Sequence, residues 1–533
     1  MNARSSLVLA LLLLFTCPFA AWSHEGDSVP GGRLGNVSFA NSCSEKVKPE
    51  FERGVAMLHS FWFSAAEKTF DNVIATDPQC AIAAWGLASI LMNNPLAGTG
   101  AAPAGAKKAV AALENAKKVR AGTQRERDYI DAASVYYEDW ANRGERARQT
   151  ARADAFEKLA AKYPQDDEAQ IFYALYRAGT QSQADQTYAA YLKAAAILEV
   201  QFKKYPGHPG VAHYLIHSYD APPIAAKGLV AARRYASIAP DAPHALHMPS
   251  HIFTRVGAWE ESASTNRRSM EVARKGNEPD EAYHAVDYMV YAFLQLSRDE
   301  DARKVTQEAM QVSGANPGRF VAPYAVAAMP ARLVVERGMW KEAAQLSLTP
   351  TTYPFVAAIT HFARAIGAAR SGDLSAAQKD AEQLAALHKA LETAKNTYWA
   401  TEVEIQRLAV AGWIALAEGK SDDALKFMRA SADLEDKNEK HIVTPGRILP
   451  ARELLGDMLL ELKQPQLALA EYQASQAREP NRFRNFYGAA VAAAASGDKA
   501  TAQKYYRQLL ALGAKGDGTR PEFARAKAVL ASK

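Results

Sequence analysis

The sequence predicts an all-α fold: an α-solenoid in which antiparallel helix pairs stack one after another. Three observations lead to this prediction. Alanine is abundant and occurs in runs such as Ala492 to Ala495, which favours helix. The strict alternation of valine and isoleucine that is typical of strands is missing. A pattern of small, bulky and proline residues recurs at fixed gaps, as it does in helical-repeat proteins.

The recurring pattern consists of two small residues, a bulky residue and a proline, separated by 12, 4 and 8 positions. It occurs twice in full, at Gly54, Ala66, Phe70 and Pro78 and again at Gly456, Ala468, Tyr472 and Pro480. Two further sets repeat the first two gaps, namely Gly412, Ala424 and Met428, and Ala490, Ala502 and Tyr506. The last set follows the Gly456 set by the length of one helical hairpin with its turns, about 34 residues.

These residues resemble the tetratricopeptide repeat (TPR) family, in which such a pattern recurs at intervals of about 34 residues. The resemblance covers most of residues 51–512. It implies a superhelix in which small residues let two helices approach closely, the bulky residue fills the gap to the next unit, and proline ends the hairpin. Gly412 and Gly456 lie further apart than one such repeat, so Lys440 to Pro450 is expected to form an extra loop.

The N-terminus has the pattern of an export signal. Arg4 precedes a short apolar stretch from Leu7 to Phe15, and Ala21 and Ser23 fit the small positions before a cleavage point. We therefore expect a signal peptide at 1–23, cleaved near Ser23/His24, and a periplasmic or secreted protein of bacterial type. No later stretch is apolar for long enough to cross a bilayer, so no transmembrane anchor is expected after cleavage.

The expected order of segments follows from the signal and the repeats. An extended segment at 24–50 precedes N-terminal TPR-like helices at 51–163, central histidine-rich units at 164–311 and C-terminal units at 312–533. Cys43 and Cys80, the two cysteines left after cleavage, flank the first hairpin and are expected to form a disulfide in an oxidising compartment. Two buried free thiols are the alternative.

The composition is that of an ordinary globular protein, with 48% apolar and 23% charged residues among 533. The net charge of +5 is spread along the chain without a basic block, so no nucleic-acid partner is expected. No phosphate-binding loop or dinucleotide fingerprint occurs, so no nucleotide cofactor is expected.

Histidine is concentrated in the centre of the chain. Six of the twelve histidines lie between residues 208 and 251. His213 and His217 have the spacing that places two side chains on one helix face, and the same pair recurs one repeat length later as His247 and His251. The resemblance places these positions on consecutive first helices of two units, facing the concave groove in which family members bind ligands.

We expect this cluster to bind a divalent transition metal (Zn, Cu or Fe), because imidazole and carboxylate groups suit these ions. His284 and Asp287 occupy groove-facing positions in the next unit and complete the predicted ligand set of His213, His217, His247, His251, His284 and Asp287. Asp220, Asp241 or Ser250 can orient the imidazoles. The alternatives are packed side chains or a metal-free, pH-sensitive surface, and His59 is expected to be packed.

Two functions from different classes remain open. The TPR resemblance implies a binding module that holds a peptide or protein ligand in its concave groove. A metal-dependent enzyme is the second, with the histidines holding the metal and Asp287, Tyr219 or Tyr288 as the candidate bases. The reaction class cannot be derived from the sequence.

Overall fold

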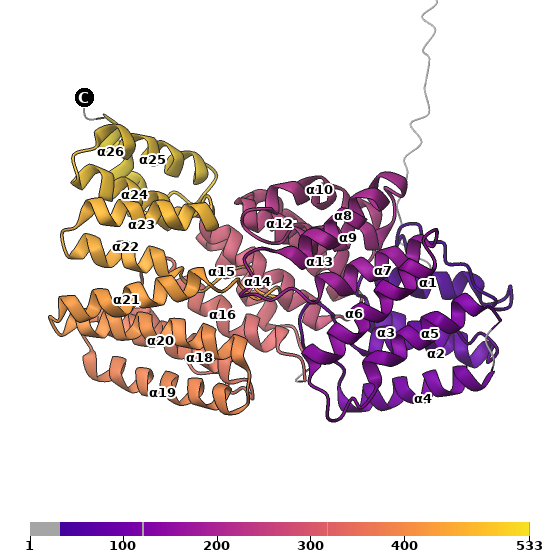
Figure 1. Cartoon of the computed structure of the whole chain (residues 1–533). Coiled ribbons are helices and arrows are strands. Elements are labelled where there is room, and N and C mark those ends of the chain that lie inside the picture. The colour runs from indigo at the N-terminus through magenta and orange to yellow at the C-terminus, as the bar shows by residue number, and fades with distance from the viewer. Residues whose placement is uncertain (1–31, 120–121, 317, 532–533) are drawn as a thin grey trace, which may run out of the picture. The chain divides into compact units, whose positions relative to one another are not determined.

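The protein is built of helices and their connections in its described parts, residues 32–119, 122–316 and 318–531 of the computed structural model (Figure 1). No strand occurs in these ranges, which confirms the all-α prediction. None of the helices in them is long and apolar enough to cross a membrane. The predicted signal peptide at 1–23 and residues 24–31 lie outside the described residues.

The helices follow one another with short connections. The first eight are α1 (Lys48–His59), α2 (Phe63–Thr76), α3 (Ala83–Leu91), α4 (Pro103–Val119), α5 (Gln124–Tyr137), α6 (Glu145–Lys162), α7 (Asp167–Ala178) and α8 (Ala189–Lys204). The central ones are α9 (Pro209–Ser218), the 3₁₀ helix η1 (Ala225–Gly228), α10 (Leu229–Ile238), α11 (Pro243–His247), α12 (Pro249–Val256), α13 (Trp259–Lys275), α14 (Pro279–Gln295) and α15 (Asp299–Met310). The remaining ones are α16 (Val321–Val335), α17 (Trp340–Ala344), α18 (Pro354–Ser371), α19 (Leu374–Thr393), α20 (Thr397–Ala417), α21 (Ser421–Asp436), α22 (Ala451–Glu461), α23 (Pro465–Arg478), α24 (Phe483–Ala495), α25 (Lys499–Leu512) and α26 (Pro521–Ala531).

Bulky residues of the repeat pattern fit between glycines of neighbouring helices. The ring of Phe70 on α2 lies so close to α1 and α3 that a Cβ atom at Gly54 would be 3.0 Å from it and one at Gly86 only 2.3 Å. Tyr472 on α23 stands in the same relation to Gly456 and Gly488, at 2.8 and 2.2 Å. Sequential pairs of helices pack on each other in this way along the chain, which gives the TPR-like solenoid that the spacing predicts (Figure 1).

One first helix of a unit is divided. The residues expected to form a single helix carrying His247 and His251 form α11 and α12, which meet at Met248. Pro249 has no N–H to donate, so the hydrogen-bond ladder is interrupted there. Met248 nevertheless keeps helical backbone angles, with φ −52° and ψ −37°, and the two histidines remain on one face.

The predicted extra loop is present and is not a surface loop. No helix is formed between Asp436 of α21 and Ala451 of α22, yet most side chains of this segment, residues 437–450, are buried. Ile442 joins the hydrophobic cluster of the first half of the chain, which runs from Leu34 to Phe253. The segment therefore links the C-terminal units to the histidine-rich ones.

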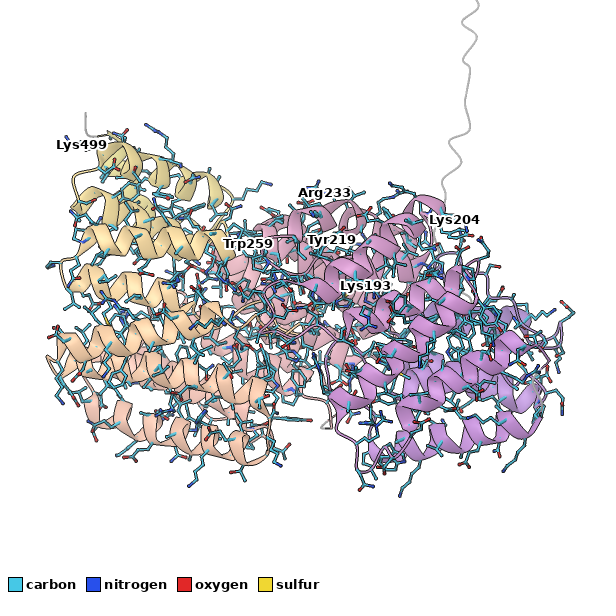
Figure 2. The ribbon with its side chains drawn as sticks, in the orientation of Figure 1. Lys193, Lys204, Tyr219, Arg233, Trp259 and Lys499 are labelled. Atoms are coloured by element: carbon cyan, nitrogen blue, oxygen red, sulfur yellow. A yellow bond between two sulfur atoms is a disulfide. The ribbon has the colours of Figure 1, made fainter. Side chains whose placement is uncertain are left out.

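Polar side chains cover the outer faces of the helices, as for Arg233 and Lys499 (Figure 2). Trp259, at the start of α13, is buried instead, and its Nε1 donates to the backbone oxygen of Asn481 at 2.7 Å. This bond is a second link between the central and C-terminal units.

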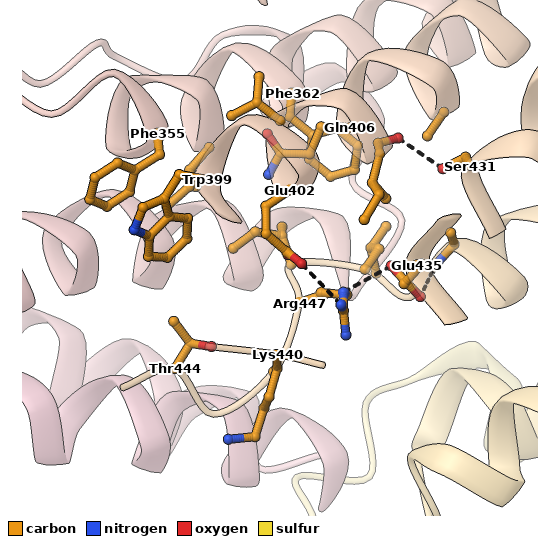
Figure 3. A pocket seen from close by; sticks show the side chains of 18 of the residues that line it. Phe355, Phe362, Trp399, Glu402, Gln406, Ser431, Glu435, Lys440, Thr444 and Arg447 are labelled. Atoms are coloured by element: carbon orange, nitrogen blue, oxygen red, sulfur yellow. Dashed lines mark hydrogen bonds and ion pairs between the residues drawn. The ribbon is translucent and has the colours of Figure 1, made fainter. Parts of the chain in front are cut away.

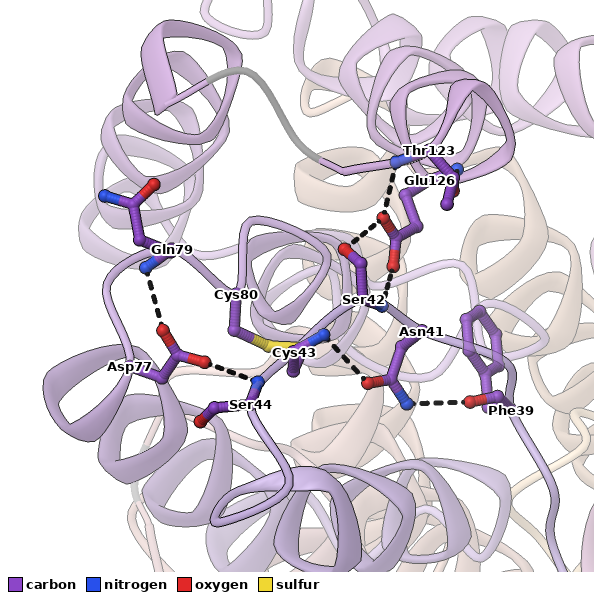
Figure 4. Close-up of a disulfide and its surroundings, with 10 residues drawn as sticks. All are labelled: Phe39, Asn41, Ser42, Cys43, Ser44, Asp77, Gln79, Cys80, Thr123 and Glu126. Carbon is purple, nitrogen blue, oxygen red and sulfur yellow. Dashed lines mark hydrogen bonds between the residues drawn. A yellow bond between two sulfur atoms is a disulfide. The ribbon is translucent and has the colours of Figure 1, made fainter.

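The structure joins Cys43 to Cys80 in a disulfide (Figure 4). The residues beside it are tied to the first helices, since Ser44 N donates to Asp77 at 2.8 Å and Ser42 Oγ donates to Glu126 at 2.7 Å. The disulfide and these bonds together hold the extended segment on the helices.

Candidate metal centre

Six buried histidines form two groups of three on consecutive units. The first triad consists of His213 and His217 on α9 and His244 on α11, and the second triad of His247 on α11, His251 on α12 and His284 on α14. In each triad, one ring nitrogen from every side chain lies within 4.8 Å of the other two. None of the six residues is more than 8% exposed.

The His-x-x-x-His pairs have the spacing of two ligands on one ion. Nε2 of His213 lies 3.1 Å from Nε2 of His217, and Nε2 of His247 lies 3.0 Å from Nε2 of His251. Two nitrogens that each lie about 2.0–2.1 Å from a zinc ion, at angles between octahedral and tetrahedral, are about 2.9–3.4 Å apart.

Outer hydrogen bonds determine which nitrogens of the second triad carry protons. Nδ1 of His247 lies 2.6 Å from Oδ1 of Asn266, whose amide nitrogen donates to the backbone oxygen of Ser262. The amide oxygen must therefore accept from His247. Nδ1 of His251 likewise donates to the carboxylate of Asp220 at 2.9 Å.

Both imidazoles of this pair consequently direct an unprotonated Nε2 at each other. Two acceptors at 3.0 Å cannot form a hydrogen bond between them. A buried acceptor without a donor costs about 1–3 kcal/mol. A cation between the two nitrogens would remove this cost, and a carboxylate such as Asp220 is the usual outer partner of a metal-binding histidine.

The first triad is held in a similar way. Nδ1 of His213 donates to the backbone oxygen of His59 at 2.6 Å, so its Nε2 is unprotonated. This Nε2 faces Nε2 of His217, whose Nδ1 has no hydrogen-bond partner in the described parts of the chain. Nδ1 of His244 lies 3.2 Å from Glu281, while its buried Nε2 has no hydrogen-bond partner among the described residues. The first triad therefore offers unprotonated nitrogens as well.

Burial keeps the imidazoles in their neutral, ligand-competent form. It lowers the pKa of His213, His217 and His247 well below the usual value, and the neighbouring imidazoles lower it further. Burial outweighs Asp220 and lowers the pKa of His251 to about 4, and it lowers that of His284 to about 3. At neutral pH these five imidazoles are therefore uncharged, which is the form that binds metal.

The two carboxylates beside the triads are ionised. Burial alone would raise the pKa of Asp220, but Lys440 and Arg255 outweigh it and hold the pKa well below its usual range. Burial is likewise outweighed at Glu281, whose hydrogen bond with His244 lowers the pKa to about 2. Each triad therefore has one negative charge behind it.

Some predicted residues lie elsewhere. Asp287 is not brought into either triad, because its carboxylate pairs with the buried Arg332 of α16 at 3.0 Å. Burial raises the pKa of Asp287, and Arg332 partly offsets that effect. Asp241 accepts from the backbone of Arg33, and Ser250 donates to the backbone oxygen of His247, so of the three predicted orienting groups only Asp220 holds an imidazole.

His59 is buried, as expected of a packed residue, but it is also part of a polar group with Glu168 and His208. Nε2 of His59 and Nε2 of His208 lie 2.9 and 3.0 Å from the two oxygens of Glu168. The other ring nitrogen of His59 bonds the hydroxyl of Tyr214 at 2.9 Å, and Nδ1 of His208 accepts from Val211 N. All four ring nitrogens have partners, so this group is complete without a metal.

Residues 437–450 lie against the second triad. Lys440 Nζ is 3.5 Å from Oδ2 of Asp220, and the hydroxyl of Tyr288, whose ring packs on His247, donates to Thr444 O. Arg332 donates to the backbone oxygens of Gly446 and Arg447. Residues 437–450, which come from the C-terminal part of the chain, thus pack beside the second triad.

Lys440 also lines a pocket between this segment and α18, α20 and α21 (Figure 3). Phe355 and Trp399 stack in its wall with ring centroids 4.0 Å apart. Arg447 crosses it between Glu402 and Glu435, at 3.0 and 3.3 Å. Arg447 thus pairs with both carboxylates, while Oε1 of Gln406, also in the lining, has no hydrogen-bond partner within the described ranges.

Comparison with known proteins gives only distant likenesses. No family model and no curated protein sequence matches the chain. The human IFIT1 dimer, solved with m7Gppp-AAAA, aligns over 77% of this chain and 87% of its own at 11% identity and a TM-score of 0.39. The APC/C hetero-tetramer Cut9–Hcn1 aligns over 89% of this chain and 95% of its own at 12% identity and a TM-score of 0.28. These scores are too low to add to the fold seen in the helices themselves.

Proposed function

We propose that the protein is a metal-binding helical-repeat module whose buried histidine cluster holds divalent transition metal, with Zn, Cu and Fe as the candidates. The observation that carries this proposal is the pair of unprotonated Nε2 atoms of His247 and His251, which face each other at 3.0 Å. Neutral imidazole is a preferred ligand for all three metals. The ionised Asp220 and Glu281 complete the environment of a metal–imidazole centre.

Elemental analysis of the purified mature protein tests this proposal. We expect near-stoichiometric metal in the wild type and its loss in the double variant His213→Ala/His247→Ala. The variant Ser269→Ala is the control, because Ser269 is buried on α13 and bonds only the backbone of Pro243. Wild-type protein that stays metal-free after aerobic and anaerobic reconstitution would refute the proposal.

We propose a peptide or protein as the partner of this module, in line with its TPR-like fold. A ligand bound along α14 and α16 would lie beside residues 437–450. The backbone oxygens of this segment accept hydrogen bonds from Tyr288 and Arg332. Backbone contacts of this kind are those that an extended ligand makes. Pull-down from the exported fraction tests this partner, which the wild type should retain and variants of the groove should lose.

A metal-dependent enzyme is the second candidate, favoured by the number of ligands. Three histidines per triad leave a coordination position for water or substrate. The candidate bases are engaged elsewhere, since Asp287 pairs with Arg332, Tyr288 donates to Thr444 O and Tyr219 donates to Glu199 at 3.1 Å. We therefore favour binding, and turnover of a substrate that requires the metal would reverse this preference.

We propose a periplasmic or secreted location, with the signal at 1–23. The disulfide between Cys43 and Cys80 supports it, because disulfides persist mainly in oxidising compartments. Fractionation of the producing cells, with mass determination of the mature N-terminus, tests both the location and the cleavage near His24.

A further inference from the structure

We infer that the cluster holds two metal ions, one in each triad, and that the second site is the first one repeated a unit further along the solenoid. This inference rests on the proposed function and adds to it the number and arrangement of the ions. Four independent features of the triads support it.

The triads are related by the repeat itself. His247 and His251 follow His213 and His217 by one repeat length, about 34 residues. His244 lies three residues before His247, and His284 lies three residues before Asp287, which has the equivalent place in the next unit. Each site therefore uses the same plan: a histidine pair from one unit and a third histidine from the beginning of the following unit.

The repetition stops on both sides for visible reasons. Gly210 lies three residues before His213 and has no side chain to offer, because His59 occupies the space: a Cβ atom there would be 2.2 Å from Nδ1 of His59. On the other side, Asp287 is engaged by Arg332. The arrangement of a histidine pair and a third histidine from the next unit therefore occurs at two consecutive places, the two triads.

Each triad has its own supporting groups. His59 O and Glu281 hold the first triad, and Asn266 and Asp220 hold the second. Phe61 packs on His213 and His244 at centroid distances of 4.4 and 5.6 Å, and Tyr288 packs on His247 and His251 at 4.6 and 5.3 Å. Among the described residues, each of these four hydrogen-bond partners contacts a histidine of one triad.

The positions of the ligand atoms also separate the triads. Six nitrogens around one ion would lie no more than about 4.2 Å apart, twice a metal–nitrogen bond. The nitrogens instead gather in two sets of three. The rings of His217 and His251, which belong to different triads, have centroids 5.5 Å apart, so the two ions would be neighbours without a common protein ligand.

Three neutral nitrogen ligands in each site suit Zn²⁺ or Cu²⁺ and leave at least one coordination position per ion. The occupant of those positions would be water or a small anion in the absence of a partner. The two sites thus form a paired centre that depends on the solenoid, because each ion joins two consecutive units.

Native mass spectrometry of the full mature chain, titrated with Zn²⁺ after chelator treatment, counts the ions. We expect two per wild-type chain, one in His217→Gln, one in His251→Gln and none when both are changed. His361→Gln is the matched control, because His361 is a buried histidine that bonds Asp380 outside the cluster, and it should keep two ions.

The outcomes separate the two proposals. One ion in the wild type that either single substitution removes would overturn the paired sites and leave the proposed metal binding intact. No ion in the wild type would overturn both. If the variants fail to fold, Cu²⁺ loading of the wild type decides: electron paramagnetic resonance at full loading should show dipolar coupling between neighbouring ions, and the spectrum of isolated Cu²⁺ would overturn the inference.

Discussion

The substitution Asn266→Leu tests how the protein prepares a histidine for metal. Asn266 is fully buried, accepts from Nδ1 of His247 at 2.6 Å and donates to the backbone oxygen of Ser262 at 2.8 Å. Leucine has a similar volume and touches no metal, but it cannot accept the proton of His247. The ring then loses the bond that keeps its Nε2 unprotonated and directed at His251.

The expected loss can be estimated from this one bond. Removing an outer partner of a metal-bound histidine lowers affinity about 10–100-fold. That loss corresponds to about 1.4–2.7 kcal/mol of binding free energy. Because the one histidine that Asn266 hydrogen-bonds among the described residues, His247, belongs to the second triad, one site should weaken while the other keeps its affinity.

Competition titration with a chelator of known zinc affinity measures both sites. We expect a biphasic curve in Asn266→Leu, with one step at the wild-type position and one displaced. Ser269→Ala removes another buried hydrogen bond of α13 and should leave both steps in place. An Asn266→Leu variant that folds and binds zinc within about twofold of the wild type at both steps would contradict this expectation, since loss of the outer hydrogen bond of a metal-bound histidine usually costs at least tenfold in affinity.

Three further predictions concern stability and are measured by urea unfolding of the metal-free protein. Replacing Cys43 and Cys80 by serine should lower the free energy of unfolding by about 4 kcal/mol, because the disulfide closes a loop between positions 37 residues apart. An unchanged urea midpoint would show that the disulfide does not constrain the unfolded chain. Burial lowers the pKa of Lys440 to about 8, below the value of about 10.4 in an unfolded chain. The unfolded state therefore binds more protons between these values, and wild-type stability should rise by about 2 kcal/mol from pH 8 to 9.5 relative to Lys440→Met; parallel pH profiles would contradict this shift. Gly210→Ala should destabilise by about 1–3 kcal/mol through its clash with His59, and a neutral effect would mean that the ring moves aside easily.

The repeat could be predicted because its causes are local. Gly456 and Tyr472 must be of these types for two helices to approach, and the gap between them is a property of one hairpin. For the same reason, the two His-x-x-x-His pairs could be found by moving one repeat length along the chain. The sequence therefore predicted the helical class, the hairpin register and four of the six clustered histidines as pairs.

The rest of the site depends on contacts between units. His244 on α11 is separated from His217 on α9 by the whole of α10, so its position in the sequence does not predict that the two side chains meet. The register of Asp287 matches that of the histidines and predicts a ligand there, but its carboxylate pairs with Arg332, 45 residues later. The roles of Asn266 and Glu281 appear only when α13 and α14 are packed on α11.

The most direct test of the central claim is crystallography of the zinc-loaded protein with data collected on both sides of the zinc absorption edge. We expect two anomalous peaks, each about 2.0–2.1 Å from three imidazole nitrogens of one triad. Peaks only at surface residues, or a cluster free of anomalous signal in protein that carries zinc, would contradict it.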